Sequence, residues 1–420
     1  MIKRLSKAPI STTLQAVRRL AVTKQHLAGP LPAKASKAHI LSVVHDPCYI
    51  QWDPIEAVAP SHSIAFWSRI GDFRRSDLDG LLWEEKKLFL HWTPIASIVL
   101  TEDYPIYSSL MRRYPESLSK SWGGNRARAK KFLAEHVELS KRILNQLKAG
   151  PLTLSQFQDH VRAGRSSDGW TPESNVSRML FHLLMSGEVM VAGHQGNQNI
   201  WALTEKFLPS SVDRKQLTEE EFDREAAQRA LRALGVASQR EVHLYFPRGR
   251  YTDPRKTLKR LEDESTIHRV QVKGLDGRDE RYVHERDVEL LESMNTDAWQ
   301  PRMSILAPFD NLLTDRGRTC RLFGFDYIHE NFLPKEKRKF GTFVHPILWG
   351  DRLIGRADLL MDKTTGKLLV NSVHAEPGAP TDKEVSSEIG ETMERLGRFL
   401  GAKEVAYSAR VPRAWRSSLR

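Results

Sequence analysis

Residues 171–203 read TPESNVSRMLFHLLMSGEVMVAGHQGNQNIWAL, and this stretch decides the predicted fold. Its opening Thr-Pro pair suits the N-cap and first position of a helix, and the apolar residues that follow recur at helical spacing. Two strand-like runs, 188–192 and 199–203, then flank the polar turn GHQGNQ. With a shorter helix at 154–161 in front, this order of helix, helix and hairpin is typical of a winged helix. An unrelated helical packing unit is the alternative.

A similar order of elements recurs on both sides of this module, without obvious sequence identity. After it, we predict helices at 220–234, 239–245 and 254–261 and strands at 267–273 and 281–284. Before it, a less regular copy has helices at 14–25, 37–46, 64–70 and 77–85 and strands at 87–92 and 96–100. The sequence therefore predicts three tandem winged-helix domains, at 1–110, 150–210 and 211–295, with a long basic helix at about 126–148 inside a linker at 111–149.

The last quarter of the chain, 296–420, departs from the order of helices and hairpins seen before it. Strand-like runs at 322–328, 343–349, 352–361 and 367–374 predict a small antiparallel sheet or barrel. A closing helix then places Ile389, Met393, Leu396 and Leu400 on one stripe and ends at Gly401. The predicted fold class is α+β.

Size and composition limit the class of protein. A chain of 420 residues exceeds one ordinary core, because domains hold roughly 100–200 residues. Its longest apolar stretches, such as 95–100, are far shorter than the roughly 18 residues of a spanning helix. Cys48 and Cys320 are the only cysteines, so they form neither a disulfide framework nor a closed metal site. We expect a reducing cytoplasm, and neither a cofactor nor a metal.

The charge balance indicates a polyanionic partner. The 64 Lys and Arg against 52 Asp and Glu give a net charge of +12, and the basic residues gather in clusters. Each cluster taken alone also fits a solvated helix face, but four in one chain favour a polyanionic ligand such as a nucleic acid. The candidate DNA contacts are Arg112, Arg113, Lys120, Arg126, Arg128, Arg178, Arg255, Lys256, Lys259 and Arg338.

The segment CYIQWDPIEAVAPSHSIAFWSRIG, residues 48–71, carries the candidate chemistry. In an extended backbone Gln51 and Asp53 point to one side and Trp52 to the other. A carboxylate and an amide so placed can hold one water, which the carboxylate deprotonates for hydrolysis through an oxocarbenium-like centre. The alternative is structural: Asp53 caps the turn at Pro54, and Gln51 satisfies backbone groups.

Three motifs resemble the AlkZ/YcaQ-type DNA glycosylases, a bacterial family of tandem winged helices with a small β-barrel. They are IQWDPI at 50–55, FWSRIGDF at 66–73 and LAPFDNLLTDRGRTCRLFGFDYIHENFLPKEKRKFGTFVHPILWGDRLIGRAD at 306–358. The resemblance implies that Gln51 and Asp53 position and activate the hydrolytic water, and the Asp places the chain nearer the YcaQ-like branch. Where the family often reads W-x-H, this chain has Pro94, with His91 on the other side of Trp92. His91 is therefore a third catalytic candidate, although a His beside Trp is also typical of packing.

The resemblance also implies the substrate, double-stranded DNA with N7-alkylated or crosslinked purines, and a bacterial protein that is associated with the nucleoid. We expect it to act as a monomer. No lysine stands beside the segment 50–53, so nothing suggests a lyase step. The competing hypothesis is a non-enzymatic winged-helix regulator in which that segment is structural. Such a regulator would form a symmetric dimer on spaced half-sites, but no coiled-coil heptads are visible.

Overall fold

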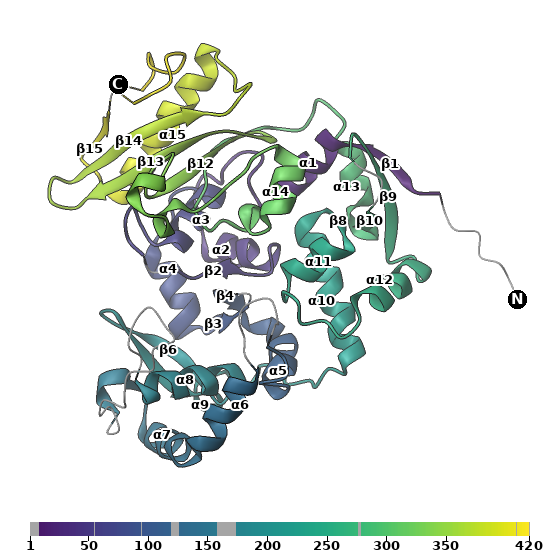
Figure 1. Ribbon diagram of the computed structural model, residues 1–420, viewed down its shortest axis with the longest axis vertical. Helices are drawn as coiled ribbons and strands as arrows, with labels where there is room; N and C mark the ends of the chain where they lie inside the picture. Colours follow the sequence, from purple (N-terminus) through teal and green to yellow (C-terminus); the bar gives the residue numbers. More distant parts are fainter. Residues whose placement is uncertain are drawn as a thin grey trace, which may run out of the picture.

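A computed structural model describes residues 8–53, 55–93, 95–118, 126–157, 174–275, 279–408 and 410–419. Its strands form four sheets, and the helices pack around and between them (Figure 1). No helix in the described part of the chain is long and apolar enough to cross a membrane. The arrangement is a mixed α+β fold, as the sequence predicts; the division into winged-helix domains stays a prediction.

The first sheet has the strand order β2-β4-β3 and carries the segment with the candidate chemistry. Its strands are β2 (Ile50–Gln51), β3 (Leu88–Trp92) and β4 (Ala96–Leu100). The surrounding elements are α2 (Lys37–His45), α3 (Ser61–Ile70), α4 (Arg75–Asp79) and a π-helical turn, η1 (Gly80–Glu84). One face of the sheet packs Ile50, Leu90 and Ile98 into a core with α3, whose ten residues are all buried.

The second sheet has the order β5-β7-β6. Its elements are α5 (Tyr104–Arg112), α6 (Arg126–Glu135), α7 (Val137–Ala149), β5 (Leu152–Thr153), α8 (Asn175–Ser186), β6 (Val189–Gln195), β7 (Gln198–Leu203) and α9 (Thr204–Phe207). The hairpin β6–β7 lies where the sequence predicts it.

Three predictions for this region need correction or lie outside the description. The expected long helix is two helices, because the chain leaves helical geometry at His136, between α6 and α7. The N-cap of α8 is Ser174, whose hydroxyl accepts from the Ser177 N–H, and not Thr171. The short helix expected at 154–161 begins as a 3₁₀ turn, Leu154–Gln156, and residues 158–173 lie outside the described part.

The third sheet, β1-β9-β10-β8, joins the start of the chain to residues far along it. Its elements are β1 (Ile10–Thr13), α1 (Leu14–Lys24), α10 (Glu219–Leu234), β8 (Val236–Ser238), α11 (Gln239–Tyr245), α12 (Pro254–Asp263), β9 (Ile267–Lys273), β10 (Arg281–His284) and α13 (Val288–Ser293). Strand β1 pairs in parallel with β9, and α1 packs its apolar face against Val236, Val270 and Val283. Residues 10–24 therefore pack with this unit, although it lies more than 200 positions further along the chain.

The C-terminal sheet has the order β11-β12-β13-β14-β15. Its elements are β11 (Met303–Ile305), α14 (Arg316–Phe323), β12 (Val344–Trp349), β13 (Arg352–Asp362), β14 (Lys367–Ala375), α15 (Lys383–Leu400) and β15 (Glu404–Tyr407). The pairing leaves β11 and β15 as the two edges, and β15 runs parallel to β14, so the described sheet is neither closed nor purely antiparallel. The strand expected at 322–328 is wrong: α14 occupies its start, and Gly324 ends that helix in left-handed geometry.

Candidate active site

Gln51 is the last residue of the edge strand β2, and its side-chain amide has no hydrogen-bond partner among the described residues. In the sheet it pairs with Ser97, which in turn pairs with His91, so the three side chains share one face. The Trp52 N–H continues the ladder by donating to the Ala96 carbonyl at 2.8 Å. The Gln51 amide, half-buried, forms no hydrogen bond to any residue that the structure describes. It is therefore free to bind a ligand.

Asp53 leaves the sheet and turns into the protein. Its Oδ1 accepts a hydrogen bond from the Ile55 N–H at 3.0 Å, which is the turn-capping role of the structural interpretation. Its Oδ2 accepts none from the described residues. Asp53 is only 8% exposed. Burial raises the pKa of its carboxyl, and the Ile55 hydrogen bond opposes that rise in part. Turn capping thus uses one oxygen and leaves the other for chemistry.

A small pocket opens beside Asp53, lined by residues from distant parts of the chain. Phe309, Phe343, His329 and His345 contribute to it together with the loop after Asp53. Both imidazoles are neutral at pH 7, because burial lowers the pKa of each to about 4. They can donate or accept hydrogen bonds there, but they do not neutralise the carboxylate.

The two imidazoles of this pocket are held in different ways. The ring stacks on Phe309 with centroids 4.5 Å apart, and its buried Nδ1 has no partner among the described residues. By contrast, the His345 Nδ1 donates to the Leu306 carbonyl at 3.0 Å, which fixes its ring. The Nδ1 of His329 is therefore a buried polar atom that a ligand can satisfy.

The ring of Trp52 stacks with two histidines. Its ring lies parallel to that of His62 at 4.1 Å and to that of His194 at 5.2 Å, between centroids. His194 belongs to the hairpin β6–β7, so this stack connects the second sheet to the candidate catalytic segment. Burial lowers the pKa of His62 to about 3 and also lowers that of His194.

His91 is a packed residue in this structure. It is 2% exposed, contacts Phe89 and Tyr107 through its ring, and has both nitrogens buried without a partner among the described residues. Burial lowers its pKa to about 3, and the Arg250 charge adds to the effect. A catalytic role for His91 stays a prediction, and Pro94 lies outside the described residues.

Buried polar groups fix the backbone that carries Gln51 and Asp53. Asn311 Nδ2 donates to the Tyr49 carbonyl at 2.9 Å, and the Tyr245 hydroxyl donates to the Pro47 carbonyl at 2.7 Å. Next to Asn311, the carboxylate of Asp310 forms a two-pronged ion pair with Arg69 on α3, at 2.7 and 2.9 Å. Both side chains of that pair are fully buried. Arg69 belongs to the motif at 66–73, and Asp310 and Asn311 belong to the motif at 306–358. These two motifs therefore support the motif at 50–55.

Comparison with known proteins agrees with this arrangement. The family description "DNA glycosylase AlkZ-like" matches residues 44–399, which contain all three motifs. The chain belongs to this family. It is therefore a DNA N-glycosylase. Among solved structures, the DNA glycosylase AlkZ of Streptomyces sahachiroi superposes with a TM-score of 0.65 at 16% identity, over 96% of this chain and all of that one. At this identity the match shows the fold alone.

The predicted DNA contacts of this glycosylase differ in how far their charges are already used. Arg113 pairs with Glu219 and lies over Phe222, and Arg178 lies over Phe132. Lys259 pairs with Glu262 and Asp263. The guanidinium of Arg338 donates to the carbonyls of Leu333 and Asn331 and to the Thr342 hydroxyl, which holds its own loop.

The remaining basic candidates are less engaged. Arg112 donates to two serine hydroxyls of its own helix, and Arg126 donates to the Leu118 carbonyl. Arg255 and Lys256 are exposed on α12 and form no ion pair with described residues. Arg128 is exposed on α6, and Lys120 lies outside the described part.

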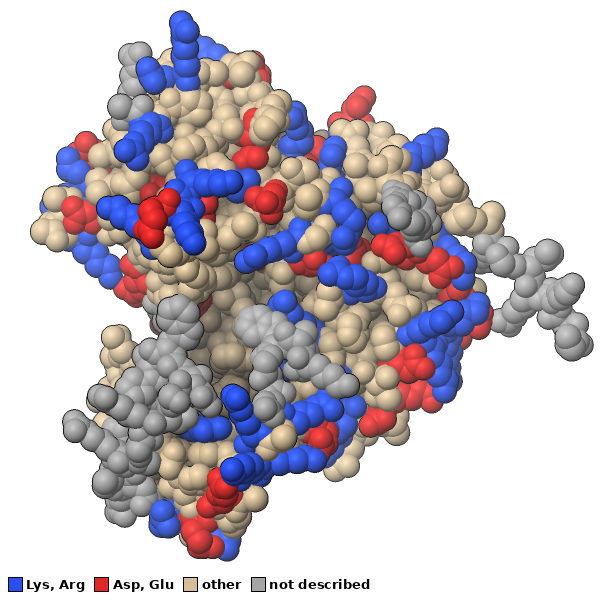
Figure 2. Space-filling model, viewed as in Figure 1, with Lys and Arg blue, Asp and Glu red and all other residues tan. Residues whose placement is uncertain are grey.

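Lys and Arg side chains stand on both sides of a hollow between the C-terminal sheet and the unit of α6 to α8 (Figure 2). Near Asp53, two large apolar side chains are exposed: Ile55, and Phe332, which is 62% exposed and contacts His329. Basic side chains with exposed aromatic ones are the composition expected of a DNA-binding surface. Within the described residues no cluster of His, Cys, Asp and Glu could hold a metal.

Sequence reasoning missed four residues of the site: His62, His194, His329 and His345. Two of them, His329 and His345, lie inside the quoted stretch 306–358, so their motif was noticed but not their role. Nothing local to residues 188–203 indicates that His194 reaches Trp52, because this contact depends on how the two sheets pack.

Proposed function

We propose that the chain is a monofunctional glycosylase that hydrolyses the N-glycosidic bond of N7-alkylated purines in double-stranded DNA, and that it acts as a monomer. Asp53 deprotonates a water that the Gln51 amide orients, and the water oxygen bonds to C1′ of the sugar. The C1′–N9 bond breaks, its electrons neutralise the cationic base, and the water proton goes to Asp53.

The observation that carries this proposal is the free Oδ2 of Asp53. A carboxylate at 8% exposure, with one oxygen fixed by the Ile55 N–H and the other without a partner among the described residues, is held in place and yet able to take a proton. The raised pKa of Asp53 makes its carboxylate a stronger base than an exposed aspartate. Gln51, on the preceding strand, supplies a neutral group that can both donate and accept.

The surroundings favour a substrate that already carries positive charge. An N7-alkylpurine leaves as a neutral base without being protonated, so the site needs no general acid. His329 and His345 suit this chemistry, since their lowered pKa values keep them neutral. None of the described residues that line the pocket is a lysine, which supports hydrolysis without a covalent step.

We extend the proposal to bulky lesions, including unhooking of interstrand crosslinks. The pocket at Asp53 is small and lies beside the exposed side chains of Ile55 and Phe332, so the base need not be enclosed in a deep flipping pocket. The site would then approach the lesion while it remains part of the duplex.

The test is incubation with duplex DNA that contains one N7-methylguanine or, separately, one nitrogen-mustard crosslink. Mild alkali then converts abasic sites to strand breaks that are measured on a denaturing gel. We expect breaks only after alkali and no protein–DNA adduct after borohydride. Breaks without alkali, or a trapped adduct, would contradict the water mechanism; no abasic sites on either substrate would contradict the substrate class.

A further inference from the structure

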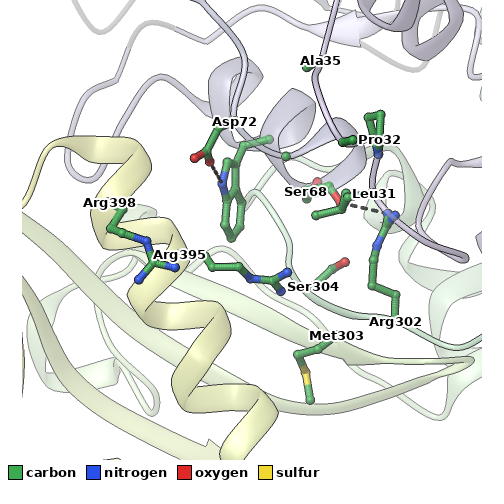
Figure 3. Close-up of a pocket in the computed structure, with 13 residues that line it drawn as sticks. Leu31, Pro32, Ala35, Ser68, Asp72, Arg302, Met303, Ser304, Arg395 and Arg398 are labelled. Atoms are coloured by element: carbon green, nitrogen blue, oxygen red, sulfur yellow. Dashed lines mark hydrogen bonds between the residues drawn. The ribbon is translucent and has the colours of Figure 1, made fainter.

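A second cavity, of about 250 Å³, lies between α15, the start of β11 and the end of α3 (Figure 3). It shares no lining residue with the pocket at Asp53. Its walls also include the loop at residues 31–35. The catalytic proposal makes no use of this cavity, so what it binds is a separate question.

Three arginines line the cavity: Arg302 at β11, and Arg395 and Arg398 one turn apart on α15. Arg302 donates to the carbonyls of Gly29 and Ser68 at 3.0 and 3.1 Å and to that of His26. Burial, together with the nearby charges of Arg69 and Arg395, lowers the pKa of Arg302 to about 10. Each of these like charges disfavours the charged form of the others, so their proximity is electrostatically unfavourable.

The carboxylates do not balance these charges. Asp72 is the one acidic residue among the described residues that line the cavity, and its Oδ1 accepts from the Trp67 indole N–H at 3.2 Å. No ion pair within the described part of the chain joins Asp72 to any of the three guanidinium groups. A cavity with three cations and no paired anion is suited to an anionic ligand.

Unused hydrogen-bonding groups point to the same conclusion. The Nε atoms of Arg302 and Arg395 are buried without a partner among the described residues, and so is the hydroxyl of Ser304, which is 2% exposed. Figure 3 shows the Arg395 guanidinium extending from α15 toward Ser304. Buried polar atoms of native proteins are nearly always satisfied, so three together in one cavity indicate a missing acceptor.

We propose that this cavity binds a phosphate group, at a site separate from the catalytic one. A phosphate offers several acceptor oxygens to guanidinium and hydroxyl donors, which is the pairing for which arginine geometry is best suited. The phosphate comes either from a small phosphate ester or from the DNA backbone. The proposal stands independently of the lesion that the glycosylase removes.

The test uses the full chain and inorganic phosphate as the probe. Thermal unfolding is followed against phosphate concentration, with chloride of equal ionic strength as the reference. We expect saturable stabilisation by phosphate in the wild type, and a Kd raised about tenfold or more in Arg395→Gln and in Arg398→Gln, since one hydrogen bond to a charged group is lost. Arg413→Gln, which removes an exposed arginine of the C-terminal tail, is the matched control and should bind phosphate as the wild type does.

A second measurement distinguishes the two sources of phosphate. If the DNA backbone occupies the cavity, inorganic phosphate weakens binding of undamaged duplex to the wild type but not to Arg398→Gln. If a small ester occupies it, duplex binding is the same in both proteins. The proposal is overturned if phosphate stabilises no more than chloride, or if Arg398→Gln and Arg413→Gln lose phosphate affinity equally. Arg398 is exposed, so its variant keeps the test valid even if Arg395→Gln fails to fold.

Discussion

The segment at residues 50–53 and the helix α12 both carry residues that the sequence marks for function, but the fold treats them in opposite ways. Around residues 50–53, side chains from α3, from the 306–345 stretch and from the hairpin β6–β7 converge, and the supporting polar groups are buried. On α12, the basic side chains lie on the surface. Lys259 and Arg260 are already paired with acidic neighbours.

This difference shows how much each kind of sequence pattern can predict about function. A short motif such as Gln-x-Asp gains its chemical meaning from distant residues, which desolvate it and fix it in place. A run of lysines and arginines gives the charge of a surface but not the number of free cations, because local ion pairs neutralise some of them. The following predictions test this contrast, from the largest expected effect to the smallest.

Replacing the carboxylate of the buried site should have the largest effect. Asp53→Asn should lower the single-turnover rate of base excision roughly 10²–10⁴-fold, since a positioned general base contributes about that much. The fold and the duplex affinity should stay unchanged. Gln51→Ala should lose less, because the amide orients the water without taking its proton. Wild-type rates in both variants would remove the proposed site.

The pH profile gives a second test of the same group. Asp53 must be ionised to act as a base, and burial raises the pKa of its carboxyl. The excision rate should therefore fall as the pH drops, with a midpoint above the ordinary aspartate value of about 4. The residual activity of Asp53→Asn should lack this acid limb. The same limb in both proteins would assign it to another group.

The buried ion pair that supports residues 50–53 should contribute measurably to the free energy of unfolding. Removing one partner of a buried ion pair costs about 3–5 kcal/mol, because the other charge is left uncompensated. We expect a loss of that size in the free energy of unfolding for Asp310→Asn or Arg69→Met, both fully buried. The double variant should lose less than either single change, and losses that simply add would argue against direct coupling.

The sequence predicts the elements well and their assembly poorly. Helical and alternating patterns place α8, α10 and the hairpins β6–β7 and β9–β10, because these signals are local. The chain at 322–328 looks like a strand from its apolar residues, but Gly324 ends a helix inside it. The pairing of β1 with β9 and the stacking of His194 on Trp52 join residues more than a hundred positions apart. No local pattern encodes such contacts.

The stack on Trp52 should have an intermediate effect. His194→Ala removes one of the two rings that hold Trp52 and leaves the Asp53 pocket untouched. We expect an excision rate lower by less than tenfold, with wild-type stability within about 1 kcal/mol. His194→Phe should restore most of the rate, since a flat ring can replace the stack. A proton-transfer role for His194 would be indicated if the Phe variant stayed as slow as the Ala variant.

The smallest effect is expected from removing basic side chains on the surface. Its size depends on whether each cation already forms an ion pair within the protein. Binding of undamaged duplex should weaken as salt rises, because each phosphate contact releases counterions and adds about 0.9 to the slope of log affinity against log salt. Arg255→Gln combined with Lys256→Gln should reduce the slope by nearly 2, since both side chains are exposed and form no ion pair with described residues. Lys259→Gln, whose charge is balanced by Glu262 and Asp263, should change it much less. Fluorescence anisotropy at several salt concentrations measures the slopes. Equal reductions per charge in the two proteins would mean that ion pairing on α12 does not decide which residues contact DNA.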